Sequence, residues 1–299
     1  MTVDATDPAV AARDLRKQFA DGPGVLNGVD VTVERGETFL LMGPNGSGKT
    51  VLLACLAGGL HPDTGTVSVF GKDPDDAADQ LSFLLQGGLA LPRLSGDETL
   101  RFYADLHPNA TDTWRDITNR LDLNALDRPV RDYSGGMVRK LELAATLSVD
   151  VPLYLLDEPT VELDMTAVDA LHAMLAERRG AGDTVVLTSH QPRDIRAADR
   201  VAFVRDGRIV ARGCPSDLRD DISTVVDIGS NGARRDALTI HLMGGQVFES
   251  DETQTGFLAA DADLADLREA VGEHGAVETR DPTPADLFNY YVHVAPDEK

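Results

Sequence analysis

Gly43-Pro44-Asn45-Gly46-Ser47-Gly48-Lys49-Thr50 matches the pattern G-x-x-x-x-G-K-[ST], and this octapeptide decides the fold. In this pattern the glycine-rich backbone surrounds the phosphates of a nucleotide, the lysine neutralises them, and the hydroxyl binds Mg²⁺. Residues 38–42 form an apolar run that predicts a buried strand before the loop, and residues 50–56 predict a helix after it. Such a helix directs its N-terminal N–H groups and the positive end of its dipole toward the phosphates. The octapeptide therefore predicts a nucleotide-binding site.

The length and composition are those of a globular protein. A chain of 299 residues has room for one α/β domain with a large core and a smaller appendage. No apolar run approaches the roughly 18 residues that a membrane span needs, and the first residues lack the layout of a signal peptide. The two cysteines, Cys55 and Cys214, form no spaced framework. We expect a soluble, cytoplasmic protein.

The charge balance is strongly acidic. There are 50 acidic and 28 basic residues, only five of them lysine, and the net charge is −22. Self-repulsion of this size weakens a compact fold at low salt and matters far less at about 1 M salt, where the Debye length is about 3 Å. The composition favours a protein from a high-salt cytoplasm over an ordinary acidic protein. No basic stripe is visible, which argues against a free DNA- or RNA-binding role.

Strands and helices alternate along most of the chain. This order predicts a mainly parallel sheet covered on both faces, with a helical insert near residues 97–140. Residues 25–33 predict an edge strand or hairpin. Further strands are expected at 66–70, 81–85, 151–156, 184–188, 201–204 and 208–211, and helices at 97–106, 113–121, 137–147 and 165–178.

The character of the sequence changes near Asp220-Asp221. Residues 220–299 contain 17 acidic and 5 basic residues. Strands are expected at 224–228, 238–243 and 246–249, and a helix at 264–271, so this segment is predicted to be a small α/β module. We expect a first domain at 1–219, with a helical subdomain at about 90–148, and a second at 220–299. Two roles stay open for the second: a solubilising appendage, or a module that holds a dimer or tunes transport.

Two further motifs add chemistry to the phosphate loop. Residues 153–156 predict a buried strand that ends in Asp157 and Glu158. An acid at this position reaches the Mg²⁺ held by the phosphate loop, and the next acid can polarise a water in line with the γ-phosphate. Ser134-Gly135-Gly136 opens the helix at 137–147 and forms a second phosphate-binding helix end, about ninety residues beyond the first.

With these motifs in view, residues 10–215 resemble the ATP-binding-cassette (ABC) ATPases, a P-loop NTPase family. Residues 43–50 resemble its Walker A motif, residues 153–158 its Walker B motif, and residues 134–136 its signature motif. Three other positions match single functional residues of that family: Gln86 the Q-loop glutamine, His190 the switch histidine, and Phe19 an aromatic ring that stacks on adenine. Residues 161–164 resemble the D-loop, whose Asp164 is also expected to cap the following helix.

The resemblance implies ATP and Mg²⁺ as ligands. The nucleotide-binding positions would be Phe19, Gly43, Asn45, Gly46, Ser47, Gly48, Lys49, Thr50 and Val51, with Ser134, Gly135 and Gly136 acting from a second subunit on its partner's ATP. Thr50, Gln86 and Asp157 would hold the metal. Glu158 would activate the attacking water, His190 would steady the γ-phosphate, and Gln86 and Asp157 would complete the catalytic set.

The signature motif departs from the family pattern at both ends. Tyr133 replaces its leading leucine and Met137 its final glutamine. This motif, followed by Arg139-Lys140-Leu141-Glu142-Leu143, is similar to the drug- and polysaccharide-export branch, also called the type 2 or daunorubicin-resistance branch. That branch carries a C-terminal extension ending in a helix, which residues 284–288 resemble. The resemblance implies a homodimer, peripheral on the inner face of the membrane, that drives export through a separate permease docked near residues 94–103.

The alternatives are non-transport ABC ATPases that serve DNA repair, translation or metallocentre assembly. Repair types carry long coiled coils, and no heptad run is present in this sequence. Translation types usually join two cassettes, whereas this chain has one phosphate loop. An ATPase that assists metallocentre assembly or envelope remodelling stays open.

Overall fold

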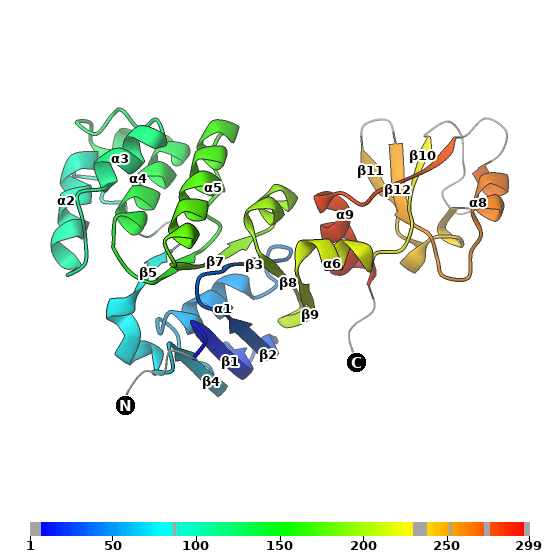
Figure 1. The fold of residues 1–299 in the computed structure, drawn as a ribbon, viewed down its shortest axis with the longest axis horizontal. Coiled ribbons are helices and arrows are strands. Elements are labelled where there is room, and N and C mark those ends of the chain that lie inside the picture. The colour runs from blue at the N-terminus through cyan, green and yellow to red at the C-terminus, as the bar shows by residue number, and fades with distance from the viewer. Residues whose placement is uncertain are drawn as a thin grey trace. The chain divides into compact units, whose positions relative to one another are not determined.

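The computed structural model describes residues 7–85, 88, 90–229, 238–250, 253–271 and 276–295. The chain forms two compact units, residues 1–209 and 210–299, coloured blue to green and yellow to red in Figure 1. Within the described ranges, no helix has the length and apolar character that crossing a membrane requires. The expected boundary at 219/220 stays a prediction.

A six-stranded sheet forms the centre of the first unit. Its strand order is β5-β6-β7-β3-β8-β9. Adjacent strands from β5 through β8 are parallel, which confirms the mainly parallel sheet. The strand bounds are β3 (Thr38–Met42), β5 (Leu81–Leu84), β6 (Leu153–Leu156), β7 (Thr184–Ser189), β8 (Arg200–Arg205) and β9 (Arg208–Gly213). All residues of β3, β6 and β7 are buried, as expected for strands covered on both faces.

A three-stranded antiparallel sheet forms a second layer. Its order is β2-β1-β4, with β1 (Val10–Gln18), β2 (Gly24–Val33) and β4 (Thr64–Val69). Helix α1 (Lys49–Leu56) contacts β2 and β4 of this sheet and β7 of the six-stranded sheet. Leu52, Leu53 and Leu56 of α1 are fully buried in the shared hydrophobic core. The core therefore fixes the helix that follows the phosphate loop.

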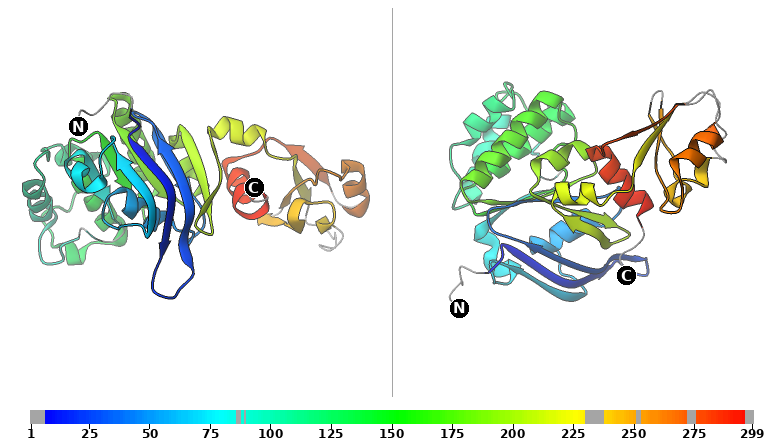
Figure 2. Two further views of the ribbon diagram at one scale, coloured as in Figure 1. Left: turned by 90° about the horizontal axis from the view of Figure 1, so that it is seen from below. Right: turned by 45° about the vertical axis from the view of Figure 1, so that its right-hand side comes forward.

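The other helices of this unit lie across the six-stranded sheet from the antiparallel layer, as Figure 2 shows. They are α2 (Gly96–Leu106), α3 (Trp114–Arg120), α4 (Gly135–Leu147) and α5 (Met165–Gly180), with short 3₁₀ turns at Pro74–Gln80, Val130–Asp132 and Pro192–Ala197. A capping box fixes the start of α2, in which Ser95 Oγ accepts from the N–H of Glu98 and the Glu98 carboxylate accepts from the N–H of Ser95.

The second unit is built on a four-stranded antiparallel sheet of order β11-β12-β10-β13. Its elements are α6 (Pro215–Asp220), β10 (Val225–Gly229), a 3₁₀ turn (Met243–Gly245), β11 (Phe248–Ser250), β12 (Thr253–Phe257), α8 (Leu264–Val271), β13 (Val277–Arg280), α9 (Pro284–Asn289) and a π-helical turn (Tyr290–Val294). The predicted strand at 238–243 is wrong, because this segment is helical and turn-like. Leu238 and Leu242 are buried, whereas Ile240 between them is 75% exposed. In a strand all three residues would face the same side, but in a helical turn only residues four apart do.

Candidate functional site

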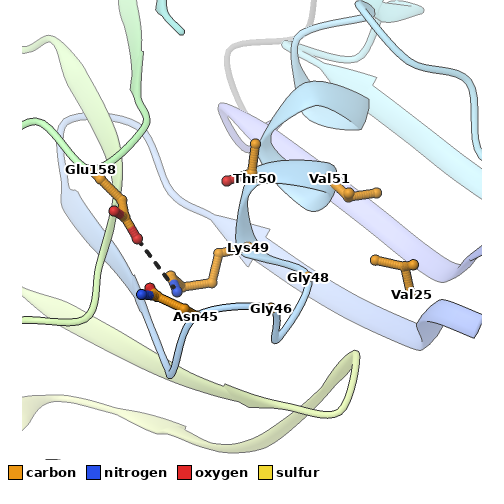
Figure 3. Close-up of a pocket in the computed structure, with 8 residues that line it drawn as sticks. All are labelled: Val25, Asn45, Gly46, Gly48, Lys49, Thr50, Val51 and Glu158. Atoms are coloured by element: carbon orange, nitrogen blue, oxygen red, sulfur yellow. Dashed lines mark ion pairs between the residues drawn. The ribbon is translucent and has the colours of Figure 1, made fainter. Parts of the chain in front are cut away.

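The phosphate loop runs from the end of β3 to the start of α1 and borders a cavity of about 270 Å³ (Figure 3). The cavity is lined by Val25, Asn45, Gly46, Gly48, Lys49, Thr50, Val51 and Glu158. Gly48 has φ +101°, and a Cβ there would lie 2.6 Å from the carbonyl oxygen of Val25. Only glycine fits this position, because a side chain would be both strained and obstructed. The loop thus presents its backbone directly to the cavity.

Lys49 points into this cavity from the first turn of α1 (Figure 3). Its ammonium donates to the carbonyl oxygens of Gly43 and Pro44 at 2.8 and 2.9 Å. Burial lowers the pKa of Lys49, an effect that the nearby carboxylates of Glu158 and Asp157 oppose. A polyanion that enters the cavity would add negative charge beside this buried ammonium and favour its charged form further.

Asp157 follows the last residue of β6 and is completely buried. Its Oδ1 accepts from the hydroxyls of Thr50, at 3.2 Å, and Thr188, at 2.6 Å. Its Oδ2 is buried and has no hydrogen-bond partner among the residues that the structure describes. A buried carboxylate oxygen without a donor is costly, so this carboxylate, whose other oxygen accepts from Thr50, suits a Mg²⁺ ion or one of its waters.

Glu158 is held in an uncommon backbone conformation, with φ +47°. Its N–H donates to the Thr188 hydroxyl at 2.8 Å. One of its carboxylate oxygens lies 3.7 Å from the Lys49 ammonium and 3.2 Å from Nδ1 of His190. The loop lysine, the second strand-end acid and the histidine after β7 therefore meet at one point, although they lie far apart in the sequence.

A buried aspartate that the sequence did not single out supports the histidine segment. Asp194 accepts from the hydroxyls of Ser189 at 2.6 Å and Thr160 at 2.7 Å, and it lies 3.1 Å from Nε2 of His172. Burial works to raise the pKa of Asp194, but these hydrogen bonds together hold that pKa below its usual value. Asp194 thereby connects Ser189, which precedes His190, to Thr160, which follows Glu158 by two residues.

The signature segment begins α4, and Ser134 is its N-cap, accepting from the N–H of Met137 at 3.3 Å. Glu162 lies against both signature glycines. A Cβ at Gly135 would lie 2.2 Å from a carboxylate oxygen of Glu162, and a Cβ at Gly136 would lie 2.7 Å from its backbone carbonyl oxygen. The packing of the segment at 161–164 therefore leaves no room for a side chain at Gly136, whereas a side chain at Gly135 would require the Glu162 side chain to move. In that segment Asp164 caps α5, accepting from the N–H of Ala167 at 2.8 Å, as predicted.

Two predicted site residues lie apart from this cluster. Gln86 falls outside the described residues. Phe19 follows β1 with 48% of its surface exposed and its ring 5.6 Å from the Lys17 ammonium, and it does not line the cavity. Adenine stacking by Phe19 and metal binding by Gln86 stay predictions.

Comparisons with known proteins show the family to which the chain is similar. The family model described as ABC transporter matches residues 26–161. The chain is 30% identical to the daunorubicin resistance ATP-binding protein DrrA3 of Streptomyces coeruleorubidus, covering 98% of each chain. It is 32% identical to the daunorubicin/doxorubicin resistance ATP-binding protein DrrA of Streptomyces peucetius, covering 73% of this chain and 69% of that protein. The dimeric ATP-binding cassette MJ0796, bound to ADP and phosphate, shares the fold with a TM-score of 0.62 and 21% identity, covering 69% of this chain and 98% of that one.

Proposed function

This chain belongs to the ABC transporter family of ATP-binding proteins, and we propose that it is the subunit whose ATP hydrolysis drives export through a separate membrane permease. The observation that carries the proposal is that Lys49, Thr50 and Glu158 line one cavity and that the buried Asp157 accepts a hydrogen bond from Thr50. A buried lysine, a hydroxyl, a carboxylate oxygen that has no partner among the described residues and a second carboxylate are groups suited to phosphoryl transfer to water.

Each group has a distinct role in the proposed hydrolysis. Lys49 exchanges its loop carbonyl partners for the β- and γ-phosphate oxygens of ATP. Thr50 and Asp157 would hold Mg²⁺, which would neutralise the charge of the phosphates. Glu158 accepts the proton of the attacking water, and His190, hydrogen-bonded to the same carboxylate, steadies the γ-phosphate.

We further propose that two copies of the chain enclose two ATP molecules. Ser134, Gly135 and Gly136 begin a thirteen-residue helix and form an N-terminal phosphate-binding end. They are not among the residues lining the cavity around Lys49, so we assign them to the γ-phosphate held by the partner subunit. The dimeric state of the similar cassette MJ0796 supports this arrangement.

The proposed partner is a permease on a separate polypeptide, to which the chain binds on the inner face of the membrane. The similarity to two daunorubicin-resistance ATP-binding proteins, one of them along nearly the whole chain, favours an export role. The transported molecule would be selected by the permease.

The proposed function is tested by phosphate release from ATP with the purified chain at high salt. We expect release that requires Mg²⁺ and stops when EDTA is added. In Asp157→Asn, half-maximal release should require a higher Mg²⁺ concentration, while the exposed control Asp76→Asn should behave like the wild type. Metal-independent release, or an unchanged Mg²⁺ requirement in Asp157→Asn, would contradict the assigned metal site.

A further inference from the structure

Arg139 is a buried cation in the second turn of α4, with 5% of its surface exposed. Its guanidinium donates to the backbone carbonyl oxygens of Asp157 and Glu158, the latter at 2.7 Å. A third contact reaches the carbonyl oxygen of Leu85, directly after β5, at 3.4 Å. One side chain of the signature helix therefore bridges the segments that follow two neighbouring strands.

The charge of Arg139 is balanced within the same helix. Its Nη1 lies 3.2 Å from a carboxylate oxygen of Glu142, whose surface is 2% exposed. A buried ion pair stabilises a fold only when its remaining donors and acceptors are also satisfied. Here the carbonyls of Leu85, Asp157 and Glu158 accept from Nη1 and Nη2, whereas Nε has no partner among the residues that the structure describes. Two well-packed apolar side chains in place of Arg139 and Glu142 would fill the same space without contacting the segment after β6. The fold alone therefore does not require this arginine.

The two carbonyl groups belong to the peptide units that orient Glu158. Its φ of +47° lies in the left-handed region, which is unfavourable for residues other than glycine, and such a conformation persists only where its surroundings hold it. Arg139 holds the carbonyl side of this backbone, and the Thr188 hydroxyl accepts from its N–H side. Together they determine where the Glu158 carboxylate lies relative to Lys49.

We propose that Arg139 is a positioning residue for Glu158. It holds the Asp157–Glu158 backbone so that the Glu158 carboxylate faces the cavity. Arg139 also lies on the helix that begins with Ser134-Gly135-Gly136. In the proposed dimer the start of this helix binds the ATP of the partner subunit, whereas Glu158 acts on the ATP of its own subunit. Arg139 therefore connects the two ATP sites. This inference deepens the proposed hydrolysis and rests on it.

The test is a comparison of Arg139→Lys in the wild-type and Glu158→Gln backgrounds. Lysine keeps the charge beside Glu142 but lacks the planar fork that reaches two carbonyls at once. We expect Arg139→Lys to lower kcat at least about tenfold, because small misplacements of a reacting group are costly, while ATP affinity stays within about twofold. In the Glu158→Gln background the same substitution should leave the residual turnover unchanged, since the base through which Arg139 acts is gone.

Arg178→Lys is the matched control. Arg178 donates to the carbonyl oxygen of Leu147 at the other end of α4, at 2.7 Å, so it makes the same kind of bond outside the site. It should leave kcat unchanged. If Arg139→Lys does not fold, the neutral pair Arg139→Gln/Glu142→Gln replaces it, with circular dichroism and thermal melting as the check, and the same pattern is expected.

An unchanged kcat in Arg139→Lys would overturn the inference. An equal loss of turnover in both backgrounds would also overturn it, because the arginine would then support the fold and not the base. Wild-type hydrolysis that Glu158→Gln does not reduce would instead refute the proposed function itself, so the two failures are distinguishable.

Discussion

The ammonium of Lys49 lies 3.7 Å from the carboxylate of Glu158, and both side chains are nearly buried. The phosphate-binding cation and the proposed base are therefore neighbours across the cavity (Figure 3). A γ-phosphate bound to Lys49 would lie beside a water held by Glu158, which is the proximity that hydrolysis needs.

Replacing Lys49 should weaken nucleotide binding. Lys49→Ala removes the buried cation of the phosphate loop, and we expect ATP affinity to fall about tenfold or more, which corresponds to about 1.4 kcal/mol. Titration with a fluorescent ATP analogue measures this affinity, with Lys72→Ala as the control outside the cavity. Wild-type affinity in Lys49→Ala would count against the phosphate-loop assignment.

The signature glycines should differ in their tolerance of a methyl group. A Cβ at Gly136 meets a backbone carbonyl, whereas a Cβ at Gly135 meets the end of the flexible Glu162 side chain, which can move. We expect Gly136→Ala to impair ATP-induced dimerisation more than Gly135→Ala, with ATP binding retained in both. Light scattering with ATP and Mg²⁺ in the Glu158→Gln background tests this.

Gly180→Ala is the control for the signature variants, because a Cβ there meets no heavy atom within 4 Å. It should dimerise like the Glu158→Gln protein without a second substitution. Equal dimerisation of Gly135→Ala and Gly136→Ala would show that contact with Glu162 does not determine how residues 134–136 act in the dimer. A parent protein that stays monomeric with ATP at high salt would argue against the enclosed pair of ATP molecules.

Salt should stabilise the folded chain. With a net charge of −22, raising KCl from about 0.1 M to about 2 M should raise Tm by several degrees, with most of the rise complete by about 1 M, where the Debye length is about 3 Å. Differential scanning calorimetry at several KCl concentrations measures this. A Tm that is flat or falls with KCl would contradict salt adaptation.

Acid should selectively remove the contribution of Asp286 in the second unit. Burial works to raise the pKa of Asp286, but bonds from Arg280 and Thr283 outweigh it and lower that pKa below its usual value. Since the folded pKa lies below the unfolded one, the stabilisation is complete above about pH 4 and is lost as pH falls through the folded pKa.

Asp286→Asn tests that contribution by denaturant unfolding. At pH 7 we expect the free energy of unfolding to fall by about 1–3 kcal/mol, and the difference from wild type to shrink as the pH is lowered below about 4. Asp281→Asn serves as the nearby control. A difference that is constant with pH would mean that the charge of Asp286 is not what stabilises the unit.

Most strands and helices of the first unit could be predicted because their apolar periodicity is strong, and the motif residues at the ends of parallel strands could be expected to converge. Strand β1 was missed because Asp14, at φ +44°, interrupts its alternation and shifts its register. The sequence does not predict strands β12 and β13, because they are short and largely polar and become strands by pairing with their neighbours, β12 with β10 and β11 and β13 with β10.

The supporting residues of the site could not be predicted. Arg139 lies in the stretch that resembles the export branch, but the sequence does not show what Arg139, Thr188 or Asp194 contacts. Each acts through a contact with a segment at least thirty residues away or on another element. Such contacts depend on how the elements pack, which a single sequence does not reveal. The Ser47 hydroxyl, buried without a partner among the described residues, is a similar feature that only the structure exposes.

The central claim is that Glu158 activates the water that cleaves ATP, and the turnover of Glu158→Gln tests it most directly. Glutamine keeps the shape of the side chain but cannot accept the proton, so we expect ATP binding to persist while turnover falls roughly 10²-fold or more. Glu177→Gln, which alters an exposed partner of Arg120, should retain full turnover. Turnover near the wild-type value in Glu158→Gln would remove Glu158 from this role and contradict the account.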